Sequence, residues 1–236
     1  MADTERLYQK DSYLKEFEAT VLDANGEYII LDKCIFIPVG GGLPNDAGVI
    51  KKDKEEYKVV YAINKDNNIS LEVDKEGLKK GDKVYCKLDW QRRYKIMQYH
   101  TAIHALSSII YKHTNALITG NQINLDKARI DFSSENFDRE ELKQFIEETN
   151  KALKTNQKVT ISYLKREEAE KQPELARLAK GLPEGIAILR IVQIGDIDKQ
   201  ADGGPHVNST SEIPELEFLD AENKGKNNRR VYFKLK

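Results

Sequence analysis

The sequence predicts an α+β protein with two domains: a small β-barrel over residues 1–90 and an α+β domain with a metal site over residues 91–236. Three observations predict this. Short β-prone runs follow one another closely up to residue 90. Beyond that point, helical and strand-like patterns mix without regular βαβ alternation. Histidines and one aspartate then recur at spacings that suit metal binding.

The barrel is predicted from short apolar runs separated by turn signals. Residues 1–14 are polar and predict an irregular lead-in or a short arm, and Asn25-Gly26 between two apolar runs indicates a hairpin. The expected strands are Glu16–Val21, Tyr28–Asp32, Cys34–Pro38, Tyr57–Ile63, Ile69–Val73 and Lys83–Leu88.

A glycine-rich loop over residues 38–48 contains Gly40, Gly41 and Gly42 between two prolines. A phosphate-binding loop would continue into Lys-Ser/Thr and a helix, and neither follows here. The pattern is typical of a surface turn, with a substrate-binding role as the alternative.

Residues 93–113 contain no Gly or Pro and predict one long helix. Its apolar residues fall in one stripe, which predicts an amphipathic helix laid on a core. His100 and His104 lie side by side at the edge of the stripe, because residues i and i+4 are neighbours on a helix. The pair alone leaves open whether they share a metal ion or are unrelated, and His113 is expected to be an ordinary surface residue. The stripe consists of Ile96, Tyr99, Ile103, Leu106 and Ile110.

A second cluster supports the hypothesis that His100 and His104 share a metal ion. The segment Asp202-Gly-Gly-Pro-His206 predicts a tight turn that could direct a carboxylate and an imidazole to one point. Together with the helical pair it makes a mixed nitrogen and oxygen donor set, suited to zinc or a similar divalent ion.

The other elements of the second domain are predicted from periodicity. Asp138, with Glu141 three residues later, predicts a capped helix start. Lys165–Lys180 predicts a charged helix that Pro173 interrupts and Gly181–Gly185 ends. Ile186–Ile194 is the most apolar run, expected to be a central strand that leads directly into the Asp202–His206 loop. Further strands are expected at Ala128–Phe132, Val159–Leu164, Leu216–Leu219 and Arg230–Leu235.

Composition limits the function classes. Charged residues make up 33% and hydrophobic ones 39% of the 236 residues, as in soluble globular proteins. The net charge of −1 argues against broad charge-driven nucleic-acid binding, although it allows a local basic patch. Cys34 and Cys86 are expected to be buried thiols in a reducing compartment. We find no signal peptide and no apolar run of about 18 residues, so we expect a cytoplasmic protein that does not enter a membrane.

The motifs together resemble the editing domain shared by alanyl- and threonyl-tRNA synthetases, and the whole chain resembles the medium-length archaeal AlaX proteins. The segments that carry the resemblance are Leu7-Tyr8, Asp11–Phe17, Gly40-Gly-Gly-Leu-Pro44 with Asp46 and Gly48, Asp89-Trp90 with Arg93 and Met97, His100-Thr-Ala-Ile-His104, Gly203-Gly-Pro-His206-Val, and Lys224–Arg230.

This resemblance implies a translation-factor-like barrel and a trans-editing hydrolase. Such an enzyme removes serine or glycine from the acceptor end of wrongly charged tRNA(Ala), needs no ATP and is expected to be a monomer. It implies that His100, His104 and His206 bind one zinc ion, or another divalent ion, while Asp202 stands where cysteine is usual. These four are the candidate catalytic residues. Leu43 and Pro205 stand where glutamine and threonine are common.

Substrate contacts are expected from the glycine-rich loop, from residues next to the ligands, and from the basic segment 224–230, which could otherwise be a solvated turn. The candidates are Gly40, Gly41, Gly42, Gln98, Thr101, Lys224, Lys226, Arg229 and Arg230. Four protein ligands leave no position for water in a tetrahedral site. Either the metal expands to five ligands, or Asp202 is loosely bound or does not bind the metal, in which case it could serve as a base. The alternative function is a catalytically weak or inactive tRNA-binding module derived from a synthetase.

Overall fold

A computed structural model of the chain describes residues 3–135, 138–179, 181–182 and 185–236. The chain forms two compact units, Met1–Ile96 and Met97–Lys236. The division between them falls within helix α2 (Trp90–Thr114). The domain boundary expected after residue 90, at the start of this helix, stays a prediction.

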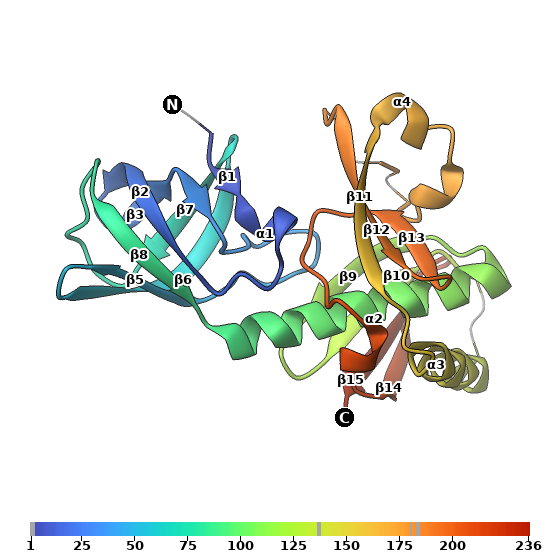
Figure 1. Ribbon diagram of the computed structural model, residues 1–236. Coiled ribbons are helices and arrows are strands. Elements are labelled where there is room, and N and C mark those ends of the chain that lie inside the picture. The colour runs from blue at the N-terminus through green and yellow to red at the C-terminus, as the bar shows by residue number, and fades with distance from the viewer. Residues whose placement is uncertain (1–2, 136–137, 180, 183–184) are drawn as a thin grey trace. The chain divides into compact units, whose positions relative to one another are not determined.

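The first unit is a closed six-stranded barrel with the order β2-β3-β7-β6-β5-β8, which confirms the predicted fold class (Figure 1). Alternate residues of each strand face the barrel interior, as Phe17, Ala19 and Val21 do in β2. The strands are β2 (Glu16–Asn25), β3 (Tyr28–Leu31), β5 (Gly48–Lys52), β6 (Glu55–Lys65), β7 (Asn68–Val73) and β8 (Lys83–Leu88).

Two glycines explain local features of the barrel. The predicted hairpin joins β2 to β3, with Asn25 opposite Tyr28 and Gly26 at a positive φ of 61°. Strand β5 was not predicted, because it begins inside the glycine-rich segment and ends in two lysines. A Cβ at Gly48 would lie 2.3 Å from the carbonyl oxygen of Lys87, so only glycine fits where β5 pairs with β8.

The predictions for residues 1–14 and for a strand over Cys34–Pro38 are wrong. The lead-in contains β1 (Glu5–Arg6) and α1 (Leu7–Lys10), and β1 pairs with the two-residue strand β4 (Lys33–Cys34). Residues 35–37 are buried, but Asp46 and Arg93, which belong to no strand, replace a neighbouring strand as their hydrogen-bond partners. Asp46 Oδ2 accepts from the Ile37 amide at 2.8 Å, and Arg93 Nη2 donates to the Ile35 carbonyl at 2.5 Å.

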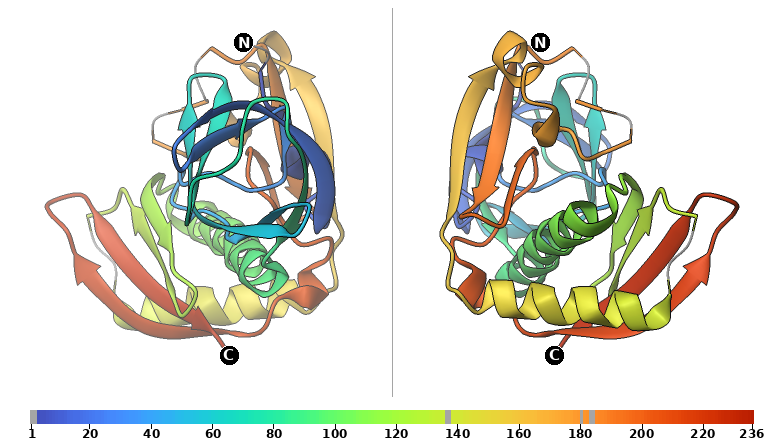
Figure 2. Two further views of the ribbon diagram at one scale, coloured as in Figure 1. Left: turned by 90° about the vertical axis from the view of Figure 1, so that its left-hand side faces the viewer. Right: turned by 90° about the vertical axis from the view of Figure 1, so that its right-hand side faces the viewer.

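The second unit contains two sheets, one on either side of α2 from Met97 onward (Figure 2). The four-stranded sheet has the order β14-β15-β10-β9, and the three-stranded sheet has the order β11-β12-β13. The first comprises β9 (Ile118–Ile123), β10 (Ala128–Phe132), β14 (Leu216–Asn223) and β15 (Arg229–Leu235); the second comprises β11 (Val159–Lys165), β12 (Ile188–Ile194) and β13 (Asp198–Ala201).

Helix α2 confirms the predicted helix but not its amphipathic character. All residues from 96 to 110 are buried, because both sheets pack on the helix. Tyr99 Oη accepts from the Leu235 amide of β15 at 3.2 Å, while Ser108 Oγ donates to the Ile197 carbonyl beside β13 at 2.5 Å. The two histidines are therefore inside the unit and not at the edge of an exposed face.

Helix α3 (Arg139–Leu153) begins as predicted after Asp138, whose carboxylate accepts from the Glu140 amide. The prediction of a charged helix over Lys165–Lys180 is wrong. Among the described residues of this range, only α4 (Arg166–Ala169) and a 3-10 turn, η1 (Pro173–Leu175), form. A proline cannot donate the hydrogen bond that a continuous helix requires at position 173. Lys180, Pro183 and Glu184 of the predicted helix and its end lie outside the described residues.

Strand β12 is central in its sheet, as predicted, but it does not lead directly to the Asp202–His206 loop. It turns at Gly195 into β13, which was not predicted, and β13 leads into the loop. Strand β9 was also missed. A second 3-10 turn, η2 (Thr210–Glu212), follows the loop. Among the described residues, no helix combines the length and the apolar character that crossing a membrane requires.

Candidate metal centre

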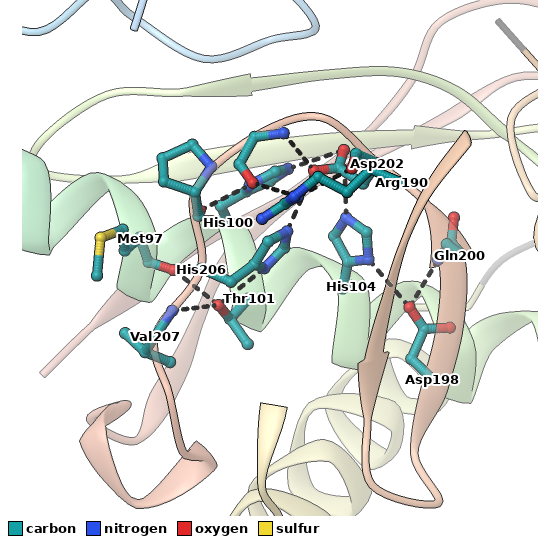
Figure 3. Close-up of polar contacts among 12 residues, drawn as sticks. Met97, His100, Thr101, His104, Arg190, Asp198, Gln200, Asp202, His206 and Val207 are labelled. Atoms are coloured by element: carbon teal, nitrogen blue, oxygen red, sulfur yellow. Dashed lines mark hydrogen bonds and ion pairs between the residues drawn. The ribbon is translucent and has the colours of Figure 1, made fainter. Parts of the chain in front are cut away.

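Four side chains from two distant segments converge in the second unit (Figure 3). Helix α2 supplies His100 and His104, and the loop after β13 supplies Asp202 and His206. Their ligand-type atoms all lie within 4.8 Å of one another. The structure therefore brings together all four residues predicted as metal ligands.

Each of the three imidazoles has its Nδ1 atom occupied by a neighbour. His100 Nδ1 lies 3.2 Å from the Pro205 carbonyl oxygen, and His104 Nδ1 lies 3.0 Å from Asp198 Oδ2. Because a carbonyl and a carboxylate can only accept, both Nδ1 atoms carry the proton.

The hydroxyl of Thr101 indicates that the ring proton of His206 is on Nδ1 as well. Thr101 Oγ1 donates to the Met97 carbonyl at 2.9 Å and accepts from the Val207 amide at 3.3 Å. Since its one proton is already used, it accepts from His206 Nδ1 at 3.0 Å. In the neutral form of each ring, Nε2 is therefore left with a lone pair.

The three Nε2 atoms face the carboxylate of Asp202. The distances are 3.2 Å from His206 to Oδ1, 3.6 Å from His100 to Oδ2 and 3.8 Å from His104 to Oδ2. Ligand atoms bound to tetrahedral zinc at their usual bond lengths lie about 3.3 Å apart. Lone pairs of three imidazoles and one carboxylate at these separations fit a divalent cation between them.

The shape of the loop depends on a glycine and an arginine. Asp202 Oδ1 accepts from the Gly204 amide at 2.7 Å, and a Cβ on Gly204 would lie 2.6 Å from His100 Cε1. The buried Arg190 of β12 donates from Nη1 to the carbonyls of Asp202 and Gly204, both at 2.9 Å. These contacts hold Asp202 against the histidines.

Burial and the neighbouring charges set the protonation of the cluster. Burial lowers the pKa of His100 to about 4, and burial together with His100 holds the pKa of His206 well below its usual range. Burial also opposes charge on His104, but hydrogen bonds to Asp198 and Asp202 outweigh it and raise its pKa to about 9. Burial raises the pKa of Asp202, yet His100, His104 and His206 together hold it well below the ordinary value. A cation that binds here therefore meets an ionised carboxylate and displaces one proton from His104.

Two predicted substrate contacts lie beside the cluster. Thr101 is fully buried, and its hydroxyl holds His206. Gln98 is buried too, and its Nε2 donates to the Glu212 carbonyl of η2 at 2.7 Å. The structure thus gives both side chains a supporting contact within the second unit, and their contact with a substrate stays a prediction.

The glycine-rich loop belongs to the first unit. The backbones of Gly40 and Leu43 pair in a tight turn, in which Gly41 and Gly42 have positive φ and the Leu43 side chain is buried. The form matches the surface turn that the pattern indicates. A substrate-binding role for Gly40, Gly41 and Gly42 stays a prediction.

The basic segment forms the turn between β14 and β15, and its cations differ in their surroundings. Arg230 forms a bidentate contact with Asp131, at 2.8 and 2.9 Å. Arg229 Nη1 donates to Asn223 Oδ1 and to the Gly225 carbonyl, and Lys224 lies 3.2 Å from Glu222. Lys226 is exposed. Arg229 thus stabilises the hairpin and Arg230 joins β15 to β10, and an RNA contact of any of the four is a prediction.

Several residues around the centre were missed from the sequence, namely Arg177, Arg190, Asp198 and Gln200. Two of them lie on β13, and the alternation Asp198, Gln200, Asp202 was a signal for it, since every second residue of a strand faces the same side. His113 is partly exposed, beside Glu148 and stacked on Phe145, as expected of a surface histidine.

Comparisons with known proteins agree with this picture. Residues 189–232 match the family described as threonyl and alanyl tRNA synthetase second additional domain, and residues 6–92 match tRNA synthetases class II (A). The chain is 45% identical to the alanyl-tRNA editing protein AlaX-M of Methanosarcina mazei, over 98% of this chain and 96% of the relative. It is also 45% identical to AlaX-M of Saccharolobus solfataricus, over 99% of both chains.

A longer relative is also similar. The alanine–tRNA ligase of Thermococcus kodakarensis is 35% identical over 94% of this chain, which spans 24% of the ligase. The match to the AlaX-M proteins covers both chains almost end to end. The chain therefore belongs to the AlaX-M family of alanyl-tRNA editing proteins.

Proposed function

We propose that the chain is a trans-editing hydrolase that cleaves the ester bond between tRNA(Ala) and a wrong amino acid, serine or glycine, with one bound divalent metal ion, most suitably zinc. The family membership supports editing of alanyl-tRNA. The observation that carries the metal-dependent chemistry is the convergence of three imidazole Nε2 lone pairs on the Asp202 carboxylate.

A zinc ion held by these residues would supply a Lewis acid for the ester carbonyl or for an attacking water. The residues of the chain have the tasks of binding and orientation. His100, His104 and His206 present Nε2 while their Nδ1 protons are held, so each ring is fixed in one orientation. Arg190 and Gly204 keep the loop carbonyls and Asp202 in place.

Asp202 has two candidate tasks in this scheme. As a ligand it would complete the donor set with Oδ2, which faces His100 and His104, while Oδ1 accepts from the Gly204 amide. As a base it would take a proton from the attacking water. Its low pKa suits a ligand better than a base, because an ionised carboxylate of low basicity is a weak proton acceptor.

Rejection of correctly charged tRNA requires a polar partner for the hydroxyl of serine, because an apolar pocket discriminates poorly between such similar side chains. Gln98 and Thr101 are the nearest candidates on α2. The exposed Lys226 and its neighbours Lys224, Arg229 and Arg230 are the candidates for the RNA phosphates, and Gly40, Gly41 and Gly42 for the acceptor end.

The test is deacylation of Ser-tRNA(Ala) by protein of measured metal content, with and without a chelator. We expect chelator-sensitive release of serine, no release from Ala-tRNA(Ala), and loss of activity in His100→Ala. A matched control is His113→Ala, which removes a partly exposed histidine from the same helix and should leave the activity unchanged. Absence of release by metal-loaded protein would contradict the proposal.

The alternative, a catalytically weak or inactive tRNA-binding module, is not favoured. The relatives that match along the whole chain carry the name editing protein. The chain also keeps four ligand-type side chains in one cluster, which a binding module would not need.

A further inference from the structure

We propose that Asp198 is a positioning residue of the metal centre, which fixes the His104 proton on Nδ1 and so directs the Nε2 lone pair toward the metal. The inference rests on the proposed metal site. Asp198 is not a member of the converging ligand set. It acts through His104, and its contribution is to metal affinity.

The geometry places one imidazole between two carboxylates (Figure 3). His104 Nδ1 lies 3.0 Å from Asp198 Oδ2, while Nε2 on the other side of the ring faces Asp202 Oδ2 at 3.8 Å. The Asp198 side chain is fully buried. A proton held between His104 Nδ1 and Asp198 excludes the other neutral tautomer, in which Nε2 would be unable to bind a metal.

The buried carboxylate is itself held in place. Gln200 Nε2 donates to Asp198 Oδ2 at 2.8 Å, and Arg177 Nη1 lies 2.8 Å from Oδ1. A buried carboxylate without compensation is unfavourable, and a guanidinium at this distance offsets that cost. These contacts hold Asp198 Oδ2 where it accepts from His104 Nδ1.

Comparison of the three imidazoles shows why His104 differs. His100 is held by the neutral carbonyl of Pro205, and His206 by the neutral hydroxyl of Thr101. Among these three Nδ1 contacts, only that of His104 is made with a carboxylate. Hydrogen bonds to ionised partners are about twice as strong as neutral ones, and a carboxylate partner makes the ring a stronger donor to the metal.

Strand β13 and the loop after it supply both a metal ligand and the residues that support a ligand. Asp198, Gln200 and Asp202 are every second residue of the segment, so β13 and its continuation present all three on the side of α2. Asp198 and Gln200 are both buried there. A purely structural role, in which Asp198 only neutralises Arg177, would affect the stability of the fold but not the affinity for a metal.

The test compares Asp198→Asn with Asp196→Asn, which makes the same change two residues away on an exposed carboxylate of the β12–β13 turn. Asparagine has one acceptor oxygen, so it cannot serve both His104 and Arg177. We expect the zinc Kd, measured by competition with a chromophoric chelator at pH 7, to rise about 10- to 100-fold in Asp198→Asn. In Asp196→Asn it should change less than about twofold, within the range of a screened surface charge.

A second readout follows the tautomer itself. In the zinc-loaded wild type, ¹⁵N–¹H spectra of the histidine rings should show His104 with its proton on Nδ1, and this signal should shift or be lost in Asp198→Asn. Circular dichroism establishes that each variant is folded. For a case in which Asp198→Asn does not fold, Gln200→Leu removes one donor to Asp198 without changing a charge, and should raise the zinc Kd by about three- to tenfold.

The outcomes separate the two proposals. Zinc binding by folded Asp198→Asn, or by Gln200→Leu in its place, with the wild-type Kd and ring spectrum would overturn the role of Asp198 and leave the metal site intact. Failure of the wild type to bind zinc would overturn the metal site and this inference with it. Loss of stability without a change in Kd would assign Asp198 to the neutralisation of Arg177 alone.

Discussion

His206 Nε2 lies 3.2 Å from Asp202 Oδ1, and in the tautomer that directs the ring proton from Nδ1 to Thr101 neither of these two atoms carries a hydrogen. Two acceptors at this distance repel each other unless a proton or a cation lies between them. The low pKa of His206 works against the proton. This pair is therefore the most direct sign in the structure that the cluster is built for a metal ion.

Substitution of Asp202 distinguishes a ligand from a base. In Asp202→Asn we expect the zinc Kd to rise by about 100-fold, because a charged ligand is replaced by a neutral one. In Asp202→Cys the thiolate should preserve zinc binding, since sulfur is a common zinc ligand. Chelator competition measures the zinc Kd, and deacylation of Ser-tRNA(Ala) by the zinc-loaded variants shows whether Asp202 is a ligand or a base. An active Asp202→Cys supports the ligand, and an inactive one that still binds zinc supports the base.

The buried ion pair of Arg93 with Asp46 should be essential for the stability of the first unit. Both side chains are fully buried, and they bind the Ile35 carbonyl and the Ile37 amide. Asp46→Asn leaves the guanidinium without its counter-charge, so we expect the free energy of unfolding to fall by about 3–5 kcal/mol.

Urea unfolding followed by circular dichroism measures this effect. The control is Glu56→Gln, which breaks the exposed pair with Lys51 and should cost less than about 1 kcal/mol. Equal stability of the two variants would show that the Ile35–Ile37 segment does not depend on the pair.

A pH-dependent contribution to stability is expected from Asp131. Burial raises the pKa of this carboxyl, but hydrogen bonds from Arg230 and Arg129 outweigh burial and lower it. A pKa lower in the folded state than in the unfolded state stabilises the fold above the unfolded value of about 4. The contribution is lost as the pH falls through the folded-state pKa.

The wild type should therefore exceed Asp131→Asn in stability by about 2 kcal/mol near pH 7, and the difference should shrink below pH of about 4. Urea titrations at a series of pH values check this. Asp220→Asn, which removes an exposed partner of Arg139, should show a difference below about 1 kcal/mol at every pH. A constant difference for Asp131→Asn down to acid pH would contradict the assignment.

Both thiols should be unreactive while the barrel is folded. Burial raises the pKa of Cys34 to about 12 and also raises the pKa of Cys86, so little thiolate forms at neutral pH. A chromogenic disulfide reagent at pH 8 should modify neither thiol in buffer and both in denaturant. Modification of folded protein at the rate seen in denaturant would indicate that the barrel opens readily.

The barrel could be predicted because its strands carry a local signal, alternating apolar residues between turn-forming ones. The failures occur where the partner of a segment is not local. The run Cys34–Pro38 is as apolar as a strand, but its backbone partners are Asp46, on the other side of the glycine-rich turn, and Arg93, which lies 58 residues from Ile35. The apolar stripe of α2 suggested one buried face, and the presence of a second sheet on the polar side cannot be read from the helix itself.

The ligand residues could be predicted because each pair lies within five residues of sequence, and because they resemble a family. Their supporting residues could not. Asp198 is a polar residue in a short strand between two turns, and only the pairing of β13 with β12 shows that it faces His104. Thr101 was placed correctly next to the ligands, but its contact with His206 depends on a loop about 100 residues away.

This separation along the chain has a thermodynamic consequence. A metal held jointly by α2 and the loop after β13 ties together two points about 100 residues apart, as a covalent crosslink would. The unfolded chain cannot offer these four ligands at one point, so the metal binds only where the intervening sheets and α3 have already assembled. The free energy of metal binding is then added to that of folding, and scarcity of the metal would reduce the amount of folded second unit as well as the activity.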